Sequence, residues 1–484
     1  MKSINKIYNR DSKKPIKIMQ FGEGNFLRSF VDYMIDIANE KSVFCGDVTI
    51  VKPISFGSLD AFYEQDNLYT VLLRGKENGN IVNDSRVITS VSKAIDAKND
   101  YDEWLALARL DNLRFIVSNT TEAGIALDKN DAFEGLPATY PGKLTKWLFE
   151  RYNHFDGAAD KGVIILPVEL IEENGKKLKE CALSLANIWN LPKGFRLWLE
   201  ESCVFCSTLV DRIVTGFPKN DAEEIYKNLG YTDKLLSVAE PFALWVIESE
   251  KDISDELPLH KAGLPVVFTD NHKPYKERKV RVLNGAHTAS VLSGYLCGID
   301  IVRDMVHDNL LGGFVKRIVY DEIAPCVPLP FYTVKAFADS VFERFENPFI
   351  DHELLSISLN SVSKWKARVL PSFKDYYYNR KALPKLITFS FAALLAFYSS
   401  CDLREDGLHA KRANGDEYVI HDDRKVLEFF AQNVGNADFI KSVCQNQDFW
   451  GEDLSLYDNF TQDVTFWYEK IMADAKNALR LVLQ

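Results

Sequence analysis

The sequence lacks a long hydrophobic run. Its longest apolar stretch, residues 386–398, is interrupted by Thr388 and Ser390. A membrane-spanning helix needs about 20 mostly apolar residues, so this stretch is expected to form a buried helix. The N-terminus, residues 1–6, is polar and leads into the polar residues 10–14, without the apolar segment of a signal peptide. We therefore expect a cytoplasmic protein without a membrane partner.

The chain also lacks an excess of positive charge. Its 484 residues include 58 Lys and Arg against 69 Asp and Glu, a formal net charge of -11. Nucleic-acid-binding domains usually carry basic surfaces, so we expect no nucleic-acid partner. An anionic small molecule stays compatible with this composition, because a site can be locally positive in an acidic protein.

Cysteine is scarce and scattered. Of the eight cysteines, Cys203 and Cys206 form a lone CxxC pair without a second pair or a paired-histidine motif. Zinc would need two further ligands, so we predict no metal site and expect two partly buried thiols in a core helix. A redox or metal role of the pair is the alternative. The scattered cysteines of this long chain also favour a reducing compartment.

Strand-like and helix-like segments alternate in the first half of the chain. Short aliphatic or β-branched runs, typical of buried parallel strands, occupy residues 16–21, 48–51, 113–118 and 162–167. Helical periodicity occupies residues 26–39, 101–110 and 143–152. This alternation predicts an open α/β sheet.

The texture changes near residue 270. Helical patterns dominate the remaining sequence, as at residues 310–320, 333–342, 383–399 and 460–483. We therefore expect two domains, an α/β domain over residues 1–270 and a mainly α-helical domain over residues 271–484. The length of the chain is sufficient for both.

A short glycine motif, Gly22-Glu23-Gly24, follows the first expected strand and precedes the first expected helix. In this context glycines let backbone N–H groups approach a pyrophosphate at a helix N-terminus. Leu27 replaces the third glycine of the usual GxGxxG, and a plain structural turn is the alternative. Lys52 stands where an acidic residue usually ends the second strand. It suits a 2′-phosphate, solvent or an adenine contact equally well.

A second motif, K-x-x-x-x-N-x-x-H, consists of Lys279, Asn284 and His287. In an α-helix, with Lys279 at zero, His287 lies at about 80° and Asn284 at about 140°, so the three share one face. A lysine of lowered pKa can transfer a proton to or from a substrate oxygen, while the amide and the imidazole hydrogen-bond to that oxygen. The alternative is a solvated lysine, a turn asparagine and a partly buried histidine.

These segments resemble the mannitol dehydrogenase family of long-chain polyol dehydrogenases. The resemblance rests on residues 20–28 and 279–287, supported by residues 118–124, 169–175, 206–214 and 273–279. It implies a Rossmann-type N-terminal domain, a mostly helical C-terminal domain and a site in the cleft between them. It also implies metal-independent, NAD-linked interconversion of D-altronate and D-tagaturonate in hexuronate breakdown.

The resemblance also implies roles for single residues. Lys279 matches the general acid/base of the family, and Asn284 and His287 match its oxygen-orienting amide and imidazole. It assigns coenzyme binding to Ile18, Met19, Gln20, Phe21, Gly22, Glu23, Gly24, Asn25, Phe26, Leu27, Arg28, Ser29, Asn119, Thr120 and Glu122.

One departure bears on the substrate. Polyol-oxidising members of the family carry an asparagine where this chain has Leu170, which favours a sugar acid over a simple polyol. A sugar acid needs a cation for its carboxylate; the candidates are Arg212, Lys276, Arg278 and Arg281. The alternatives are a fructuronate reductase or polyol dehydrogenase of the same family, and an NAD(H)-binding sensor without turnover. The oligomeric state is not predicted.

Overall fold

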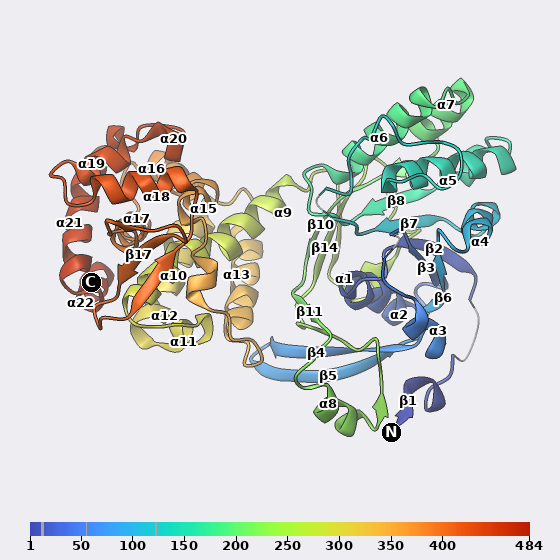
Figure 1. Ribbon diagram of the computed structural model, residues 1–484, viewed down its shortest axis with the longest axis horizontal. Coiled ribbons are helices and arrows are strands. Elements are labelled where there is room, and N and C mark those ends of the chain that lie inside the picture. Colours follow the sequence, from blue (N-terminus) through green and yellow to red (C-terminus); the bar gives the residue numbers. More distant parts are fainter. Residues whose placement is uncertain (11–13, 55, 122) are drawn as a thin grey trace. The chain divides into compact units, whose positions relative to one another are not determined.

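The computed structural model describes residues 1–10, 14–54, 56–121 and 123–484. It contains two compact units (Figure 1). Unit 1 comprises residues 1–74 and 81–272, and unit 2 comprises residues 75–80 and 273–484. The chain passes from unit 1 to unit 2 near residue 270. A short earlier segment, residues 75–80, also belongs to unit 2, which the sequence did not predict.

The main sheet of unit 1 has six parallel strands. Its spatial order is β6 (Val91–Asp96), β3 (Asp47–Lys52), β2 (Ile16–Phe21), β7 (Phe115–Ser118), β8 (Ile164–Pro167) and β9 (Val204–Phe205). Numbered along the chain, this is the order 3-2-1-4-5-6 of a dinucleotide-binding Rossmann sheet. The expected α/β sheet is therefore confirmed, and the order reverses between β2 and β7.

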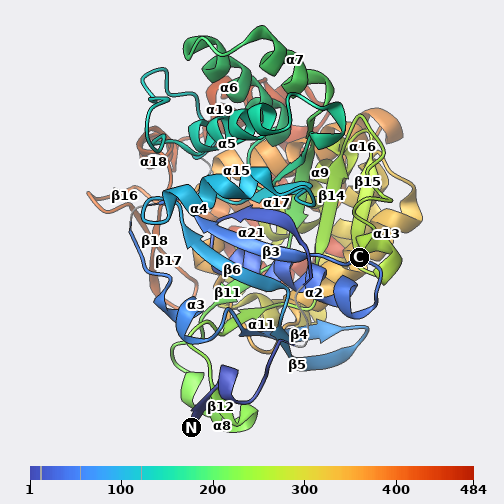
Figure 2. The same ribbon diagram turned by 90° about the vertical axis from the view of Figure 1, so that its right-hand side faces the viewer.

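Both faces of this sheet are buried, because successive side chains of a strand point to opposite faces. Ile18 and Val117 belong to one hydrophobic core, whereas Met19 and Ile116 belong to the other. Figures 1 and 2 show α4 to α7 on one side of the sheet and α1 and α2 on the other. The helices of unit 1 are α1 (Asn25–Leu27), α2 (Tyr33–Glu40), α3 (Asp60–Glu64), α4 (Tyr101–Ala106), α5 (Tyr140–His154), α6 (Asn174–Ile188), α7 (Lys193–Glu201) and α8 (Ala222–Leu229).

Further strands extend unit 1 beyond the expected sheet. They are β1 (Lys2–Ser3), β4 (Tyr69–Glu77), β5 (Asn80–Ile88), β10 (Ser207–Asp211), β11 (Val214–Gly216), β12 (Tyr231–Thr232), β13 (Ser237–Ala239), β14 (Leu244–Glu248) and β15 (Val266–Thr269). The tip between β4 and β5 is grouped with unit 2, where Lys76 pairs with Glu346 and the Gly79 N–H donates to Glu343. Cys203 and Cys206 flank β9, so the expectation that they lie in a core helix is wrong.

Unit 2 is mainly helical, as expected. Its helices are α9 (Lys273–Arg278), α10 (Gly285–Leu296), α11 (Val302–His307), α12 (Asn309–Arg317), α13 (Phe331–Phe345), α14 (Leu354–Ile357), α15 (Ser361–Arg368), α16 (Leu370–Arg380), α17 (Lys385–Phe397), α18 (Arg424–Asn433), α19 (Phe439–Cys444), α20 (Gln447–Trp450), α21 (Phe460–Ala473) and α22 (Ala475–Leu483). A three-stranded sheet joins β16 (Asp402–Leu403), β17 (Leu408–Lys411) and β18 (Glu417–Ile420).

Two helical predictions need correction in detail. The helix expected over residues 460–483 breaks at Asp474, where the backbone is extended. The Asp474 side chain caps the start of α22 by accepting a hydrogen bond from the Asn477 N–H. The helix expected over residues 26–39 contains a π-helical turn at Arg28–Asp32. The apolar stretch that includes α17 is buried almost throughout, and no described helix is long and apolar enough to cross a membrane.

Candidate active site

The glycine motif lies in the turn that follows β2. Gly22 has a backbone φ of +122°, which residues with a side chain rarely adopt, and its N–H donates to the Val51 carbonyl. A Cβ atom at Gly22 would lie 3.1 Å from the Asn119 carbonyl oxygen and 3.2 Å from Leu27 Cδ1. The turn therefore requires glycine at this position, and Leu27 fills the space beneath it.

Gly24 differs from Gly22 because it faces open space. Its φ is -67°, and a Cβ atom there would meet no atom within 4 Å. It immediately precedes α1, where backbone N–H groups are not used within the helix. A ligand can therefore approach the backbone closely at this glycine.

A cavity of about 470 Å³ opens at the turn. It lies beside the carboxyl ends of β2, β3 and β7, the crevice in which Rossmann-type sheets bind nucleotides. Among the described residues, its charged side chains are the carboxylates Glu23 and Asp128 and the ammonium Lys143. The other lining residues are Gly22, Gly24, Pro53, Ile54, Phe56, Asn119, Thr120, Thr121, Ala123, Gly124, Ala126, Leu127, Ala138, Thr139 and Tyr140.

Buried Glu169 holds the loop after β7 in place. Its carboxylate accepts hydrogen bonds from Ser118 Oγ at 3.1 Å and from Thr120 N and Oγ1, both at 3.0 Å. Burial raises the pKa of Glu169, although these hydrogen bonds oppose the shift. Sequence reasoning did not assign a role to Glu169, which the segment 169–175 contains. Glu122 of the same loop lies outside the described residues.

The expected coenzyme residues separate into two groups. Gly22, Glu23, Gly24, Asn119 and Thr120 line the cavity. The others lie within β2 (Ile18, Met19, Gln20 and Phe21) or in the helical segment after the turn (Asn25, Phe26, Leu27, Arg28 and Ser29).

Arg28 and Ser29 have internal partners. The Arg28 guanidinium donates to the Glu23 carbonyl at 3.1 Å and to the Leu235 carbonyl, and it lies 5.2 Å from the Tyr69 ring centre. Ser29 Oγ donates to Ser237 Oγ at 2.8 Å in a buried position. These contacts tie the π-helical turn to the protein interior.

Lys52 is not a solvated residue, as one sequence interpretation allowed. It ends β3, is only 2% exposed, and its Nζ lies 2.7 Å from Asp96 Oδ2. Burial would raise the pKa of Asp96, but the hydrogen bonds from Lys52 and from the Lys98 and Asn99 N–H groups outweigh it, and the pKa is lowered. An ionised carboxylate therefore neutralises the lysine.

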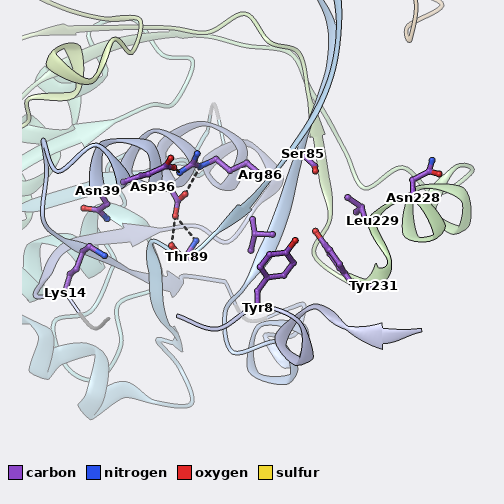
Figure 3. A pocket seen from close by; sticks show the side chains of 12 residues that line it. Tyr8, Lys14, Asp36, Asn39, Ser85, Arg86, Thr89, Asn228, Leu229 and Tyr231 are labelled. Atoms are coloured by element: carbon purple, nitrogen blue, oxygen red, sulfur yellow. Dashed lines mark hydrogen bonds and ion pairs between the residues drawn. The ribbon is translucent and has the colours of Figure 1, made fainter. Parts of the chain in front are cut away.

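A second cavity in unit 1, of about 600 Å³, is larger but lies elsewhere (Figure 3). This cavity does not lie at the carboxyl ends of the parallel strands, and Arg86, which lines it, forms ion pairs within the protein. Arg86 Nε lies 2.7 Å from Asp36, which also accepts hydrogen bonds from Thr89. Arg86 additionally pairs with Glu40. We therefore assign the smaller cavity at the glycine turn as the candidate nucleotide site.

In unit 2, the K-x-x-x-x-N-x-x-H motif is helical but not α-helical throughout. Lys279–Asn284 form a π-helical turn between α9 and α10, in which the Gly285 N–H donates to the Val280 carbonyl five residues earlier. In such a turn residues five apart lie about one turn apart. The 140° offset between Lys279 and Asn284 was expected for an α-helix and does not hold here, because this segment is a π-helical turn.

All three motif residues are half-buried, and His287 has the most distinctive surroundings. Its ring stacks on Phe345 at 4.2 Å and lies edge-on to His352 at 5.5 Å. Its Nε2 atom is buried and has no hydrogen-bond partner in the described part of the chain. Burial, followed by the charges of His352 and Arg344, lowers the pKa of His287 to about 3. The imidazole is therefore neutral and retains hydrogen-bonding capacity.

Besides Arg344, two further cations near His287 were missed by sequence reasoning. Arg368 and Lys364 lie on α15, and their positive charges contribute to the lowered pKa of His287. Arg368 Nη1 donates to Thr288 Oγ1 at 3.4 Å, and Lys364 Nζ donates to the Ile357 carbonyl at 3.0 Å. Burial lowers the pKa of both. They lie about 80 residues after the motif, so no local pattern connects them with it.

The expected carboxylate-binding cations have varied surroundings. Arg281 pairs with Asp375 and, at 3.1 Å, with Glu277. Arg212 belongs to unit 1, where it donates to the carbonyls of Glu240 and Ser29. Arg278 is buried, with its guanidinium 4.5 Å from the Phe337 ring centre, and Lys276 is half-buried on α9. The structure thus uses Arg212 and Arg281 in internal contacts.

The candidate metal ligands do not gather. Among the described residues, no group of three or more His, Cys, Asp or Glu side chains could hold a metal ion. Cys203 and Cys206 are buried free thiols, and burial raises the pKa of each to about 12. A thiol of raised pKa is a poor nucleophile and a poor metal ligand.

The domain pair decides the family. Residues 16–261 match the mannitol dehydrogenase Rossmann domain, and residues 271–472 match the mannitol dehydrogenase C-terminal domain. The chain belongs to the mannitol dehydrogenase family. It is therefore an oxidoreductase.

Relatives of this family member resemble it over their full length. Altronate oxidoreductase of Escherichia coli O7:K1 (strain IAI39 / ExPEC) is 42% identical over 493 residues, with 99% of this chain and 100% of the relative covered. Altronate oxidoreductase of Yersinia enterocolitica serotype O:8 / biotype 1B is 41% identical over 488 residues, with 99% of each covered.

Solved structures of lower identity share the fold. A substrate-free D-sorbitol dehydrogenase aligns with a TM-score of 0.76 at 21% identity, covering 98% of this chain and 96% of that one. Pseudomonas fluorescens mannitol 2-dehydrogenase, solved with NAD and D-mannitol, aligns with a TM-score of 0.63 at 21% identity, covering 98% and 95%.

Proposed function

We propose that the protein is an NAD-dependent oxidoreductase that interconverts D-tagaturonate and D-altronate. The observation that carries the proposal is the surroundings of His287. Its imidazole is neutral, its buried Nε2 has no hydrogen-bond partner among the described residues, and it lies on the same helical segment as Lys279 and near Arg344, Arg368 and Lys364. The full-length relatives named altronate oxidoreductase support a sugar acid as the substrate.

Lys279 is proposed to move the proton. When a ketone is reduced, the oxygen gains negative charge, and a positioned ammonium group donates a proton to it. In the reverse direction the neutral amine removes the hydroxyl proton. The π-helical turn supports this role, because such turns often occur at functional sites.

Asn284 and His287 are proposed to orient the same oxygen. The amide of Asn284 donates one hydrogen bond, and the neutral imidazole of His287 donates a second. Because burial and neighbouring positive charges oppose protonation of His287, this residue acts as a hydrogen-bond donor and leaves the proton transfer to Lys279.

The glycine turn of unit 1 fits NAD(H). Gly22 shapes the turn, Gly24 leaves the backbone open, and the cavity follows the strand ends at which nucleotides bind. When bound, the nicotinamide supplies or accepts the hydride. The chain's own groups contribute backbone N–H donors and the loop that Glu169 fixes.

Arg368 and Lys364 are proposed to attract the carboxylate of the sugar acid. A carboxylate near His287 would reduce the mutual repulsion of these cations. A guanidinium also binds a carboxylate with two parallel hydrogen bonds. Among the candidates named from sequence, Arg281 already pairs with Asp375 and Glu277, which favours Arg368 over it.

A substrate panel tests the proposal. Purified protein is assayed for NADH oxidation with D-tagaturonate, D-fructuronate and D-fructose. We expect D-tagaturonate to give the highest kcat/KM. A preference for D-fructuronate would identify a fructuronate reductase, and a preference for D-fructose a polyol dehydrogenase. NADH binding with no oxidation by any of the three would favour a sensor without turnover.

A further inference from the structure

The carboxylate that the second strand lacks is present on the third. In Rossmann-type domains an acidic residue at the end of the second strand binds the adenosine ribose of NAD, whereas a cation there accommodates the 2′-phosphate of NADP. Here β3 ends in Lys52, and its neighbour in the ladder is Asp96, the last residue of β6. Their side chains form an ion pair of 2.7 Å.

This ion pair lies beside the nucleotide cavity. Pro53 and Ile54, which follow Lys52 directly, line the cavity. Glu23 also lines the cavity, and the charges of both Lys52 and Asp96 contribute to the pKa of its carboxyl group. The pair therefore lies at the ends of β3 and β6, next to the region in which the ribose hydroxyls bind in this fold.

Asp96 has further partners that fix its carboxylate. Oδ1 accepts a hydrogen bond from the Lys98 N–H at 2.9 Å, and Oδ2 accepts one from Asn99 Nδ2 at 3.1 Å. The carboxylate thus stays oriented while it holds the buried Lys52 ammonium. A lysine held in this way is not available to a phosphate, and the carboxylate repels one.

We propose that the Lys52–Asp96 ion pair selects NAD(H) against NADP(H). Asp96 pairs with Lys52, the cation that would otherwise bind a 2′-phosphate. Its carboxylate also places a negative charge where that phosphate would lie. The basic residue at the strand end therefore does not indicate NADP. This inference rests on the proposed function, because it assumes that the cavity binds a nicotinamide dinucleotide.

Coenzyme binding to the full-length protein tests the inference without a substrate. The dissociation constants of NADH and NADPH are measured by fluorescence titration for the wild type and for Asp96→Asn. The control variant is Asp84→Asn, which removes the same charge from an exposed position on β5. The readout is the ratio of the NADPH constant to the NADH constant.

We expect the wild type to bind NADPH at least about 100-fold more weakly than NADH. Asp96→Asn should lower this ratio at least about tenfold, chiefly through tighter NADPH binding, because it releases Lys52 and removes the repulsion. Asp84→Asn should leave the ratio unchanged. A wild-type ratio near one would overturn the inference, as would an unchanged ratio in a folded Asp96→Asn variant.

A double variant covers the case in which Asp96→Asn fails to fold. Lys52→Met/Asp96→Asn removes both charges, so no unpaired ammonium is buried. The ratio should still fall, because the repulsion is gone, and an unchanged ratio would again overturn the inference. A wild type that binds neither coenzyme would contradict the proposed function itself, whereas tight NADH binding with an unaltered ratio would contradict only the role of the ion pair.

Discussion

The two units carry candidate sites built from opposite kinds of groups. In unit 1 the described lining of the cavity at the glycine turn carries two carboxylates and one lysine, and Lys52 beside it is neutralised by Asp96. In unit 2 the neutral His287 has positive groups around it, among them Arg344, Arg368 and Lys364. We therefore propose that shape, backbone groups and the Lys52–Asp96 ion pair recognise the coenzyme, and that side chains of net positive charge recognise the substrate.

Loss of the proton donor should have the largest effect. Lys279→Ala is expected to lower kcat for D-tagaturonate reduction by about 10²–10⁴-fold, with little change in the dissociation constant of NADH. Steady-state kinetics and a coenzyme titration measure the two quantities. Lys441→Ala, at an exposed position of α19, serves as the control. If Lys279→Ala turned over D-tagaturonate at the wild-type rate, Lys279 would not be the proton donor.

Loss of a carboxylate-binding cation should come next. Arg368→Ala is expected to raise KM for D-tagaturonate by about 10–100-fold, because a hydrogen bond to a charged group contributes about 1.5–3 kcal/mol. KM for NADH should stay unchanged. Arg380→Ala, at an exposed position of α16, is the control. An equal loss for D-tagaturonate and for uncharged D-tagatose would show that Arg368 does not bind the carboxylate.

The two glycines of unit 1 offer a matched pair. Gly22→Ala should lower the melting temperature and weaken NADH binding, because its backbone conformation costs of order 1–3 kcal/mol for a residue with a side chain. Gly24→Ala should leave the melting temperature unchanged and weaken NADH binding alone, since its Cβ meets no protein atom. Thermal melts and NADH titrations check both. Unaltered NADH binding by Gly24→Ala would argue against a close approach of the coenzyme there.

The smallest effect concerns pH. The pKa of His287 is lowered from about 6.5 to about 3, so the unfolded chain binds more protons than the folded one between these values. The contribution of His287 to stability is therefore complete above pH 6.5 and is lost as the pH falls toward 3. Nuclear magnetic resonance of the imidazole, assigned with His287→Asn, should show no titration between pH 5 and 8. A titration midpoint of the His287 imidazole near pH 6.5 would contradict a pKa lowered by burial and neighbouring positive charges.

The sequence was most informative where a structure is formed by neighbouring residues. The strand over residues 16–21, the turn at Gly22 and the buried helix at α17 all follow from short-range patterns of glycine and apolar residues. The resemblance to the family connected the two distant motifs with one predicted activity, which periodicity alone could not do.

What sequence reasoning missed depends on contacts between distant segments. Glu169 fixes the loop at Thr120, Asp96 neutralises Lys52, and Arg368 contacts Thr288. Each pair is separated by tens of residues and has no characteristic spacing. The π-helical turn at Lys279 was missed for another reason: its residues have ordinary helical periodicity, and the extra residue in the turn is visible only in the hydrogen bonds.

The most direct test of the comparison uses two substrates that differ at one group, which is charged in one of them and neutral in the other. D-Tagatose carries a hydroxymethyl group where D-tagaturonate carries a carboxylate. We measure kcat/KM for the NADH-dependent reduction of each by the wild-type protein. Recognition by charge in unit 2 predicts a value for D-tagaturonate at least about 100-fold higher. Equal values, or a preference for D-tagatose, would contradict it.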